Sequence, residues 1–260
     1  MVDATLVHCV NISGARLIMC TPDIAPNVEA ILPTLPKDIR AFAFEYGSFP
    51  NIPSTPSIPL LHHADLPPLS PNFQQPKVGP NDIANLIYTS GTTGNPKACA
   101  IQQGFLALIT ATGHHLKGSP PRTLSCMPVF HGTCYFTGLS MSAGCGGCFI
   151  LLRKFSARNY WKDCYESRAT KILYVGELCR YLLATPEGEY DKKHQVEVAS
   201  GNGMRAEVWD KFKTRFNIPT IQEYYRSTEV LSPIQSDIDN RVSPGTITSR
   251  SVMVFGDPDE

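Results

Sequence analysis

Hydrophobic and polar positions follow two alternating patterns along most of the chain. Short apolar runs bounded by glycine, proline or polar residues predict buried strands, and apolar residues spaced three or four apart predict helices. Strands are expected at 16–20, 41–45, 83–88, 97–101, 123–127, 148–152, 172–175, 194–200 and 220–225. Helices are expected at 3–15, 22–32, 103–116, 156–168, 177–183 and 205–216. The alternation of strands and helices predicts an α/β fold with a parallel layer.

Two segments depart from this pattern. Proline recurs throughout residues 50–80, so neither a helix nor a central strand is expected there. We interpret this segment as an extended surface connection within a domain, because the next strand begins directly after it. Residues 138–147 are rich in small side chains and carry no clear periodicity. After Leu231 the periodicity is poor, which predicts a domain over 1–231 and a poorly defined tail over 232–260.

Composition narrows the class of protein. The 260 residues are 42% hydrophobic and 18% charged, as in an ordinary globular protein. Lysine plus arginine and aspartate plus glutamate both number 23, and this balance argues against a nucleic-acid partner. No apolar run approaches the roughly 20 residues of a transmembrane helix, and the start shows neither a signal peptide nor another membrane anchor.

The cysteines indicate a reduced, intracellular protein. There are nine, an odd number, and they are scattered through apolar contexts. The spacing Cys145-Gly146-Gly147-Cys148 would suit a metal or a redox pair. No second cysteine or histidine pair stands at zinc spacing, so we interpret these four residues as packing.

The segment with the clearest chemistry runs from Tyr88 to Lys97. It follows an apolar strand and consists almost entirely of glycine and small hydroxyl residues, closed by Pro96 and Lys97. Glycine permits unusual backbone conformations, and successive backbone N–H groups in such a turn can form an anion site. The hydroxyls add donors and the lysine adds a point charge suited to phosphate. These residues predict a loop that wraps a polyphosphate, and their spacing differs from that of a Walker A loop.

The same motif resembles the phosphate-loop signature of adenylate-forming enzymes: acyl-CoA synthetases, luciferases and peptide-synthetase adenylation domains. Two further blocks, 154–157 and 174–183, resemble the fatty acid transport protein branch, the very long-chain acyl-CoA synthetases. The block 201–205, followed by Trp209, is similar to the same branch. The resemblance runs from near the N-terminus to about Glu229. It implies layered sheets with flanking helices, part of the large N-terminal domain of those enzymes, without their C-terminal domain.

The resemblance also implies an activity. Members of the family activate a carboxylic acid with ATP and Mg²⁺ to an acyl-adenylate, and then transfer the acyl group to coenzyme A. For this branch the implied small-molecule partner is a fatty acyl substrate. The expected location is intracellular, in the cytoplasm or peripheral on the endoplasmic reticulum or peroxisome membrane. We expect the missing C-terminal domain to impair the activity.

The resemblance assigns roles residue by residue. Lys97, Thr228 and Glu229 would be catalytic, with Glu229 holding Mg²⁺. The nucleotide would be bound by Thr89, Ser90, Gly91, Thr92, Thr93, Gly94, Lys97, Gly201, Asn202, Gly203, Tyr225 and Thr228. The acid substrate would lie beside His131, Tyr174, Gly176 and Glu177.

The chain departs from the family pattern at two places. Arg226 stands where the family has glycine, and Gly256-Asp257 is the sole trace of the block that would hold the ribose. These departures keep two alternatives open beside an acyl-CoA ligase. One is a non-catalytic module that binds a nucleotide, an acyl group or another protein, and the other is a remnant without a stable fold.

Overall fold

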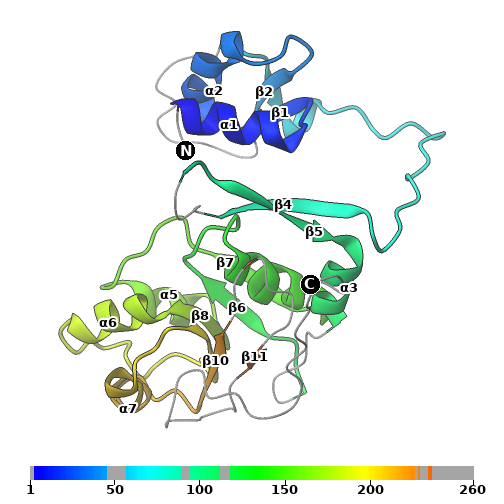
Figure 1. Ribbon diagram of the computed structural model, residues 1–260. Coiled ribbons are helices and arrows are strands. Elements are labelled where there is room, and N and C mark those ends of the chain that lie inside the picture. The colour runs from blue at the N-terminus through cyan, green and yellow to red at the C-terminus, as the bar shows by residue number, and fades with distance from the viewer. Residues whose placement is uncertain are drawn as a thin grey trace, which may run out of the picture. The chain divides into compact units, whose positions relative to one another are not determined.

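The computed structural model describes residues 3–45, 57–89, 94–111, 118–225, 228 and 234–235 (Figure 1). The chain divides into two compact units, which are described separately. The first unit contains residues 1–78 and 88–100, and the second contains residues 79–87 and 101–260. The Tyr88–Lys97 segment belongs to the first unit, whereas the later blocks of the family resemblance belong to the second.

The first unit is built on a three-stranded parallel sheet. Its strands are β1 (Leu17–Cys20), β2 (Arg40–Glu45) and β3 (Leu60–His62), in the order β1-β2-β3. Its helices are α1 (Asp3–Ser13), α2 (Ala25–Ile31) and the short 3₁₀ turns η1 (Pro22–Ile24), η2 (Leu32–Thr34) and η3 (His63–Asp65). A small core of Cys20, Ala25, Val28, Ala43 and Ile58 joins α2 to one face of the sheet.

Strand β3 lies within the proline-rich stretch, where no strand was predicted. It is three residues long and pairs only at the edge of the sheet. The N–H of Ala43 donates to the carbonyl of Pro59 at 2.9 Å. Proline has no N–H but keeps its carbonyl, so a proline-rich chain can still join an edge. The Glu29 carboxylate accepts hydrogen bonds from the backbone of Ile58, at 3.2 Å, and of Ser57, and it thereby holds the entry to β3.

The second unit is built on a six-stranded sheet. Its strands are β6 (Arg122–Ser125), β7 (Cys148–Leu151), β8 (Lys171–Val175), β9 (Val198–Asn202), β10 (Thr220–Tyr225) and β11 (Ile234–Gln235), in the order β11-β10-β9-β8-β6-β7. All neighbours are parallel except β10 and β11. Strands β4 (Ile83–Thr89) and β5 (Lys97–Gln102) pair separately. The predicted α/β class with a parallel layer is confirmed.

Strand β8 is buried on both faces of this sheet. Its residues Ile172 and Tyr174 pack into a large core with α5 (Tyr160–Glu166), α6 (Gly176–Ala184) and α7 (Ala206–Arg215), which Figure 1 shows grouped together. Leu173, between them, packs with Met127 and with Cys134 of the π-helix η4 (Thr133–Ser140). Helices α3 (Gln103–Ala111) and α4 (Met141–Gly144) pack against η4. The sequence of a strand with helices on both faces is usually a continuous apolar run, as it is over residues 172–175 of β8.

The helical segment 133–144 was not predicted, because its small residues lack a helical apolar period. Gly138 is the reason it packs closely. A Cβ at Gly138 would lie 2.6 Å from the Phe149 ring and 2.9 Å from a Leu173 methyl group. Small residues thus bring the π-helix η4 down onto the sheet.

Two predicted boundaries were wrong. Helix α5 begins at Tyr160, and Ser156 does not cap it with its side chain. Instead, the Ser156 carbonyl accepts hydrogen bonds from the N–H groups of Asn159 and Tyr160 at 3.1 and 2.9 Å. Strand β9 begins at Val198, so His194 precedes it.

The nine cysteines are all free thiols, and burial raises the pKa of Cys126 to about 11. Within the described residues, no helix has the length and apolar character needed to span a membrane.

His194 gives the fold a dependence on pH. Its ring stacks on Trp161 with the centroids 4.5 Å apart, and its Nδ1 accepts a hydrogen bond from the Val196 N–H at 3.1 Å. Burial lowers the pKa of the His194 imidazole from its usual 6.5. Above about pH 6.5 the ring is neutral in both states, and its contribution to stability is complete. Below that pH the unfolded chain takes up a proton first, so stability falls.

We expect His194→Gln to remove part of the loss of stability between pH 7.5 and 5.5. The unfolding free energy of both proteins, measured in urea at steps of pH, tests this expectation. After correction for their difference at pH 7.5, the curve of the unsubstituted protein should fall below that of the variant toward acid pH. Parallel curves over this range would contradict the assignment to His194.

Candidate functional site

The predicted phosphate loop joins β4 to β5. Thr89 is the last residue of β4. Lys97 is the first residue of β5, and its side chain is exposed. Gly94 is exposed, and a Cβ there would meet nothing within 4 Å among the described atoms. Ser90, Gly91, Thr92 and Thr93 lie outside the described residues. The flanks, β4 and β5, pair as the expected hairpin.

Helix α1 holds both flanks of this loop. The Tyr88 hydroxyl donates to the carbonyl of Cys9 at 2.7 Å, on the β4 side. The His8 Nε2 donates to the carbonyl of Pro96 at 3.0 Å, on the β5 side. Burial raises the pKa of the Tyr88 hydroxyl, which keeps it a donor. No sequence pattern indicated these contacts of His8 and Cys9, since each hydrogen bond joins residues more than 75 positions apart and leaves no local pattern.

In the second unit, four predicted segments leave one edge of the sheet. Strands β6, β8, β9 and β10 are parallel, so their carboxyl ends lie along the same edge. Ligands of open α/β sheets bind at this edge. The residues that follow these strand ends are His131 after β6, Gly176 and Glu177 after β8, Gly203 after β9, and Thr228 after β10. The other predicted site residues are the last or second-last residues of the strands themselves: Tyr174 of β8, Gly201 and Asn202 of β9, and Tyr225 of β10.

The segments after β6 and β10 meet directly. His131 is exposed, its N–H donates to the Pro128 carbonyl at 3.0 Å, and its carbonyl accepts from Tyr135 at 3.0 Å. A Cβ on the adjacent Gly132 would lie 3.6 Å from the Thr228 hydroxyl oxygen. The backbone of Tyr225 is described but its side chain is not, and Arg226 and Glu229 lie outside the described residues.

The ends of β8 and β9 approach so closely that only glycine fits. A Cβ on Gly176 would lie 1.7 Å from the carbonyl oxygen of Gly203, and a Cβ on Gly201 would lie 2.1 Å from the carbonyl oxygen of Tyr174. Gly203 adopts φ +79°, a conformation that residues with a Cβ rarely reach. The Gly201–Gly203 turn is therefore constrained both by its own backbone and by its neighbour.

A buried carboxylate joins the same strand ends. Glu223 of β10 is 3% exposed, and its Oε1 accepts hydrogen bonds from the N–H groups of Met204, at 3.1 Å, and Gly203. Its Oε2 accepts a hydrogen bond from the hydroxyl of Tyr174, which is fully buried. Burial raises the pKa of Glu223, while the hydrogen bonds from Tyr174, Met204 and Gly203 oppose that shift. The sequence analysis missed Glu223, because an acidic residue in a strand pattern normally indicates a solvated face.

One acceptor at this edge has no partner within the described part of the chain. The Asn202 side-chain oxygen Oδ1 is buried and makes no hydrogen bond there. A buried polar atom of this kind is ordinarily satisfied by water or by a ligand. Within the same residues, no group of three histidine, cysteine, aspartate or glutamate side chains lies close enough to hold a metal ion.

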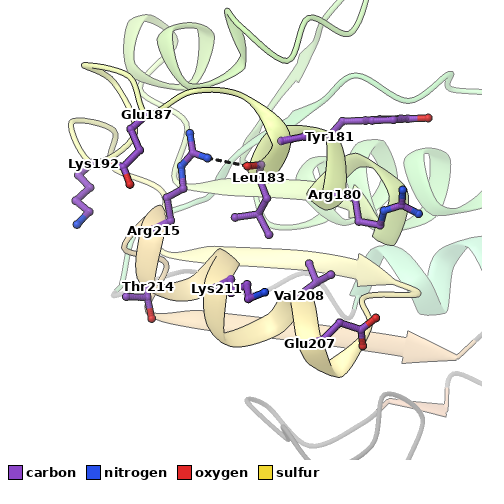
Figure 2. A pocket seen from close by; sticks show the side chains of 11 residues that line it. Arg180, Tyr181, Leu183, Glu187, Lys192, Glu207, Val208, Lys211, Thr214 and Arg215 are labelled. Carbon is purple, nitrogen blue, oxygen red and sulfur yellow. Dashed lines mark hydrogen bonds between the residues drawn. The ribbon is translucent and has the colours of Figure 1, made fainter.

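A surface groove lies elsewhere, between α6 and α7 (Figure 2). Its volume is about 850 Å³, and none of the predicted site residues lines it. At one end, the Arg215 guanidinium donates to the Asp191 carboxylate at 2.9 Å and to the carbonyls of Leu183, Thr185 and Pro186 at 2.8–2.9 Å. These carbonyls lie at and just beyond the end of α6, so Arg215 acts as its C-terminal cap.

Comparison with known proteins places the chain in a family. Residues 2–254 match the family described as AMP-binding enzyme, and the chain belongs to that family. Its relatives include the long-chain fatty acid transport protein 1 of Mus musculus, 33% identical over 94% of this chain. They also include the very long-chain fatty acid transport protein of Saccharomyces cerevisiae, 39% identical over 86% of this chain. The chain spans 38% and 34% of the lengths of these two relatives.

Solved structures support the fold. ATP-bound MatB from Rhodopseudomonas palustris superposes with a TM-score of 0.64 over 92% of this chain and 45% of its own, at 18% identity. The expected resemblance to adenylate-forming enzymes, and within them to the fatty acid transport branch, is confirmed.

The contact between Gly176 and Gly203 yields a stability prediction. Gly176→Ala should destabilise the protein by at least about 3 kcal/mol, because either β8 or the Gly203 turn must move. Gly188→Ala is the matched control, since its Cβ would lie 3.6 Å from the Asp191 side chain, an ordinary van der Waals contact. The control should change stability by less than about 0.5 kcal/mol. Urea unfolding and soluble yield compare the two variants, and similar values for both would refute this close approach.

Proposed function

We propose that the chain binds ATP and activates a fatty or other carboxylic acid as an acyl-adenylate. The AMP-binding family uses ATP, and the MatB structure that shares the fold is ATP-bound. The relatives named as fatty acid transport proteins favour a fatty acyl substrate. The activated acyl group would then pass to the thiol of coenzyme A.

In the first half-reaction, a carboxylate oxygen of the acid attacks the α-phosphorus of ATP. A new P–O bond forms, the bond to the β-phosphate breaks, and pyrophosphate leaves with its electron pair. Chemistry of this kind needs positioning and neutralisation of charge on the phosphates. We assign this work to Lys97, the hydroxyls of residues 89–93, and Thr228. Mg²⁺, held by the Glu229 carboxylate, would supply further neutralisation when bound.

The adenine would lie along the Gly201–Gly203 turn. At Gly203 the absence of a Cβ allows a ligand close to the backbone, and the Asn202 Oδ1 offers a buried acceptor. An exocyclic amine is the kind of donor that suits such an acceptor. The side chain of Tyr225 would complete this subsite as an aromatic neighbour.

The acid substrate would approach from the segments after β6 and β8. We assign His131, Gly176 and Glu177 to its carboxylate end, together with Tyr174 as part of the wall of the site. In the second half-reaction the thiol sulfur of coenzyme A attacks the acyl carbon, the acyl–phosphate bond breaks, and AMP leaves.

One observation carries this proposal. Segments separated by up to about 100 residues, which the family resemblance assigns to the nucleotide or the acid, follow parallel strands that end at one edge of a single sheet. This common edge supports the proposal, because ligands of open α/β sheets bind there. A chain that merely binds nucleotide is the alternative, and it would share the same edge.

Exchange of labelled pyrophosphate into ATP separates these two functions. We expect exchange that depends on Mg²⁺ and on an added acid, with fatty acids of different chain lengths as the panel. Calorimetry with ATP under the same conditions reports binding. Binding without exchange by any acid would favour the non-catalytic alternative, and the absence of both in folded protein would refute the proposal.

Lys97→Ala should weaken ATP binding about tenfold or more, since a charged contact to phosphate is lost. Lys77→Ala is the control, because it removes another exposed lysine of the first unit that no motif assigns to the site. Calorimetric titration with ATP and Mg²⁺ measures both dissociation constants. Equal affinity in the Lys97→Ala variant and in the control would remove Lys97 from the phosphate site.

A further inference from the structure

Glu223 is an unusual residue for the interior of this unit. It lies in β10 with 3% of its surface exposed, and an ionised carboxylate loses most of its hydration in such a position. Three donors replace the lost water: the N–H groups of Gly203 and Met204 on Oε1, and the Tyr174 hydroxyl on Oε2. Hydrogen bonds to a charged acceptor are stronger than those between neutral groups.

These donors come from the ends of β9 and β8, the first and second strands beside β10 in the sheet. Tyr174 lies at the end of β8, and Gly203 and Met204 follow the end of β9. One side chain therefore joins the carboxyl ends of three neighbouring parallel strands. Since both backbone amides bond to the same oxygen, the carboxylate fixes the position and the direction of the turn that contains them.

The bonds constrain the turn where its shape matters most. Gly203 has a positive φ, and its carbonyl oxygen faces Gly176 at a distance that no Cβ would permit. With its amide held by Glu223 and its carbonyl held against α6, the peptide at Gly203 has little freedom to rotate. The adjacent Asn202, with its buried acceptor, is fixed by the same contacts.

We propose that Glu223 is a positioning residue for the nucleotide, acting through the Gly201–Gly203 turn, and that Tyr174 orients its carboxylate. The role rests on the proposed function, because it assumes that this turn contacts ATP. Glu223 and Tyr174 do not touch the nucleotide themselves. Tyr174, assigned above to the wall of the site, acts from the interior through its hydroxyl.

A matched pair of tyrosines tests the proposal. Tyr174→Phe removes the hydroxyl that bonds to Glu223. Tyr160→Phe removes the hydroxyl of another fully buried tyrosine of the same core, and that hydroxyl has no hydrogen-bond partner within the described residues. Both variants keep the ring, so both should fold. Glu223→Gln is a third variant, which keeps the shape of the side chain and removes its charge.

Calorimetry with ATP and Mg²⁺ should show a dissociation constant raised about fivefold to tenfold in Tyr174→Phe and in Glu223→Gln, and unchanged in Tyr160→Phe. In pyrophosphate exchange, the KM for ATP should rise in the first two variants. In Glu223→Gln, whose residue is assigned no contact with the acid, the KM for the acid should stay the same. Amide hydrogen exchange should become faster at Gly203 and Met204 in those variants. A purely structural role would lower the active fraction without this selective change in KM.

The outcomes separate the two proposals. If the unsubstituted chain binds ATP and all three variants bind it equally well, the positioning role is wrong and the proposed function stands. If Tyr160→Phe weakens binding as much as Tyr174→Phe does, the effect is general to the core and the positioning role is also wrong. If the folded, unsubstituted chain does not bind ATP, the proposed function fails and the positioning role fails with it.

Discussion

The approach of two backbone segments at the ends of β8 and β9 governs the architecture of the second unit. The space that a Cβ on Gly176 would need is occupied by the Gly203 carbonyl, and the space that a Cβ on Gly201 would need is occupied by the Tyr174 carbonyl. No side chain separates the two backbone segments at these points. Neighbouring groups therefore contact the turn after β9 through its backbone, as in the hydrogen bonds from the Gly203 and Met204 N–H groups to Glu223.

The packing of helices on both faces of β8 stabilises this close approach of β8 and β9. Helices α5, α6 and α7 cover one of its faces, and η4 covers the other, so its register relative to β6 and β9 is held on both sides. A strand buried in this way cannot slip by one residue without exchanging its two faces. The sheet thus ends at the carboxyl edge, and the residues that we assign to the substrates follow it.

Much of this organisation could be predicted from the sequence, for reasons that differ between elements. The apolar run at 172–175 predicted a buried strand because a strand covered on both faces is mostly apolar. The Tyr88–Lys97 segment was predicted to join two strands because glycine and small hydroxyl residues follow an apolar run there, and its role in holding phosphate stays a prediction. Helix η4 was missed because small residues pack by proximity and carry no apolar period. Glu223 was missed because its partners come from other strands, and His8 because it contacts a loop far along the chain.

The two bonds from α1 to the β4–β5 hairpin have a consequence for the loop between them. They fix both ends of the seven-residue connection 89–95, so the chain has already lost the entropy of bringing those ends together. Under the proposed function, helix α1 would lower the entropic cost of holding phosphate without contacting the ligand itself, because it restricts the conformations that the two ends of the loop can adopt.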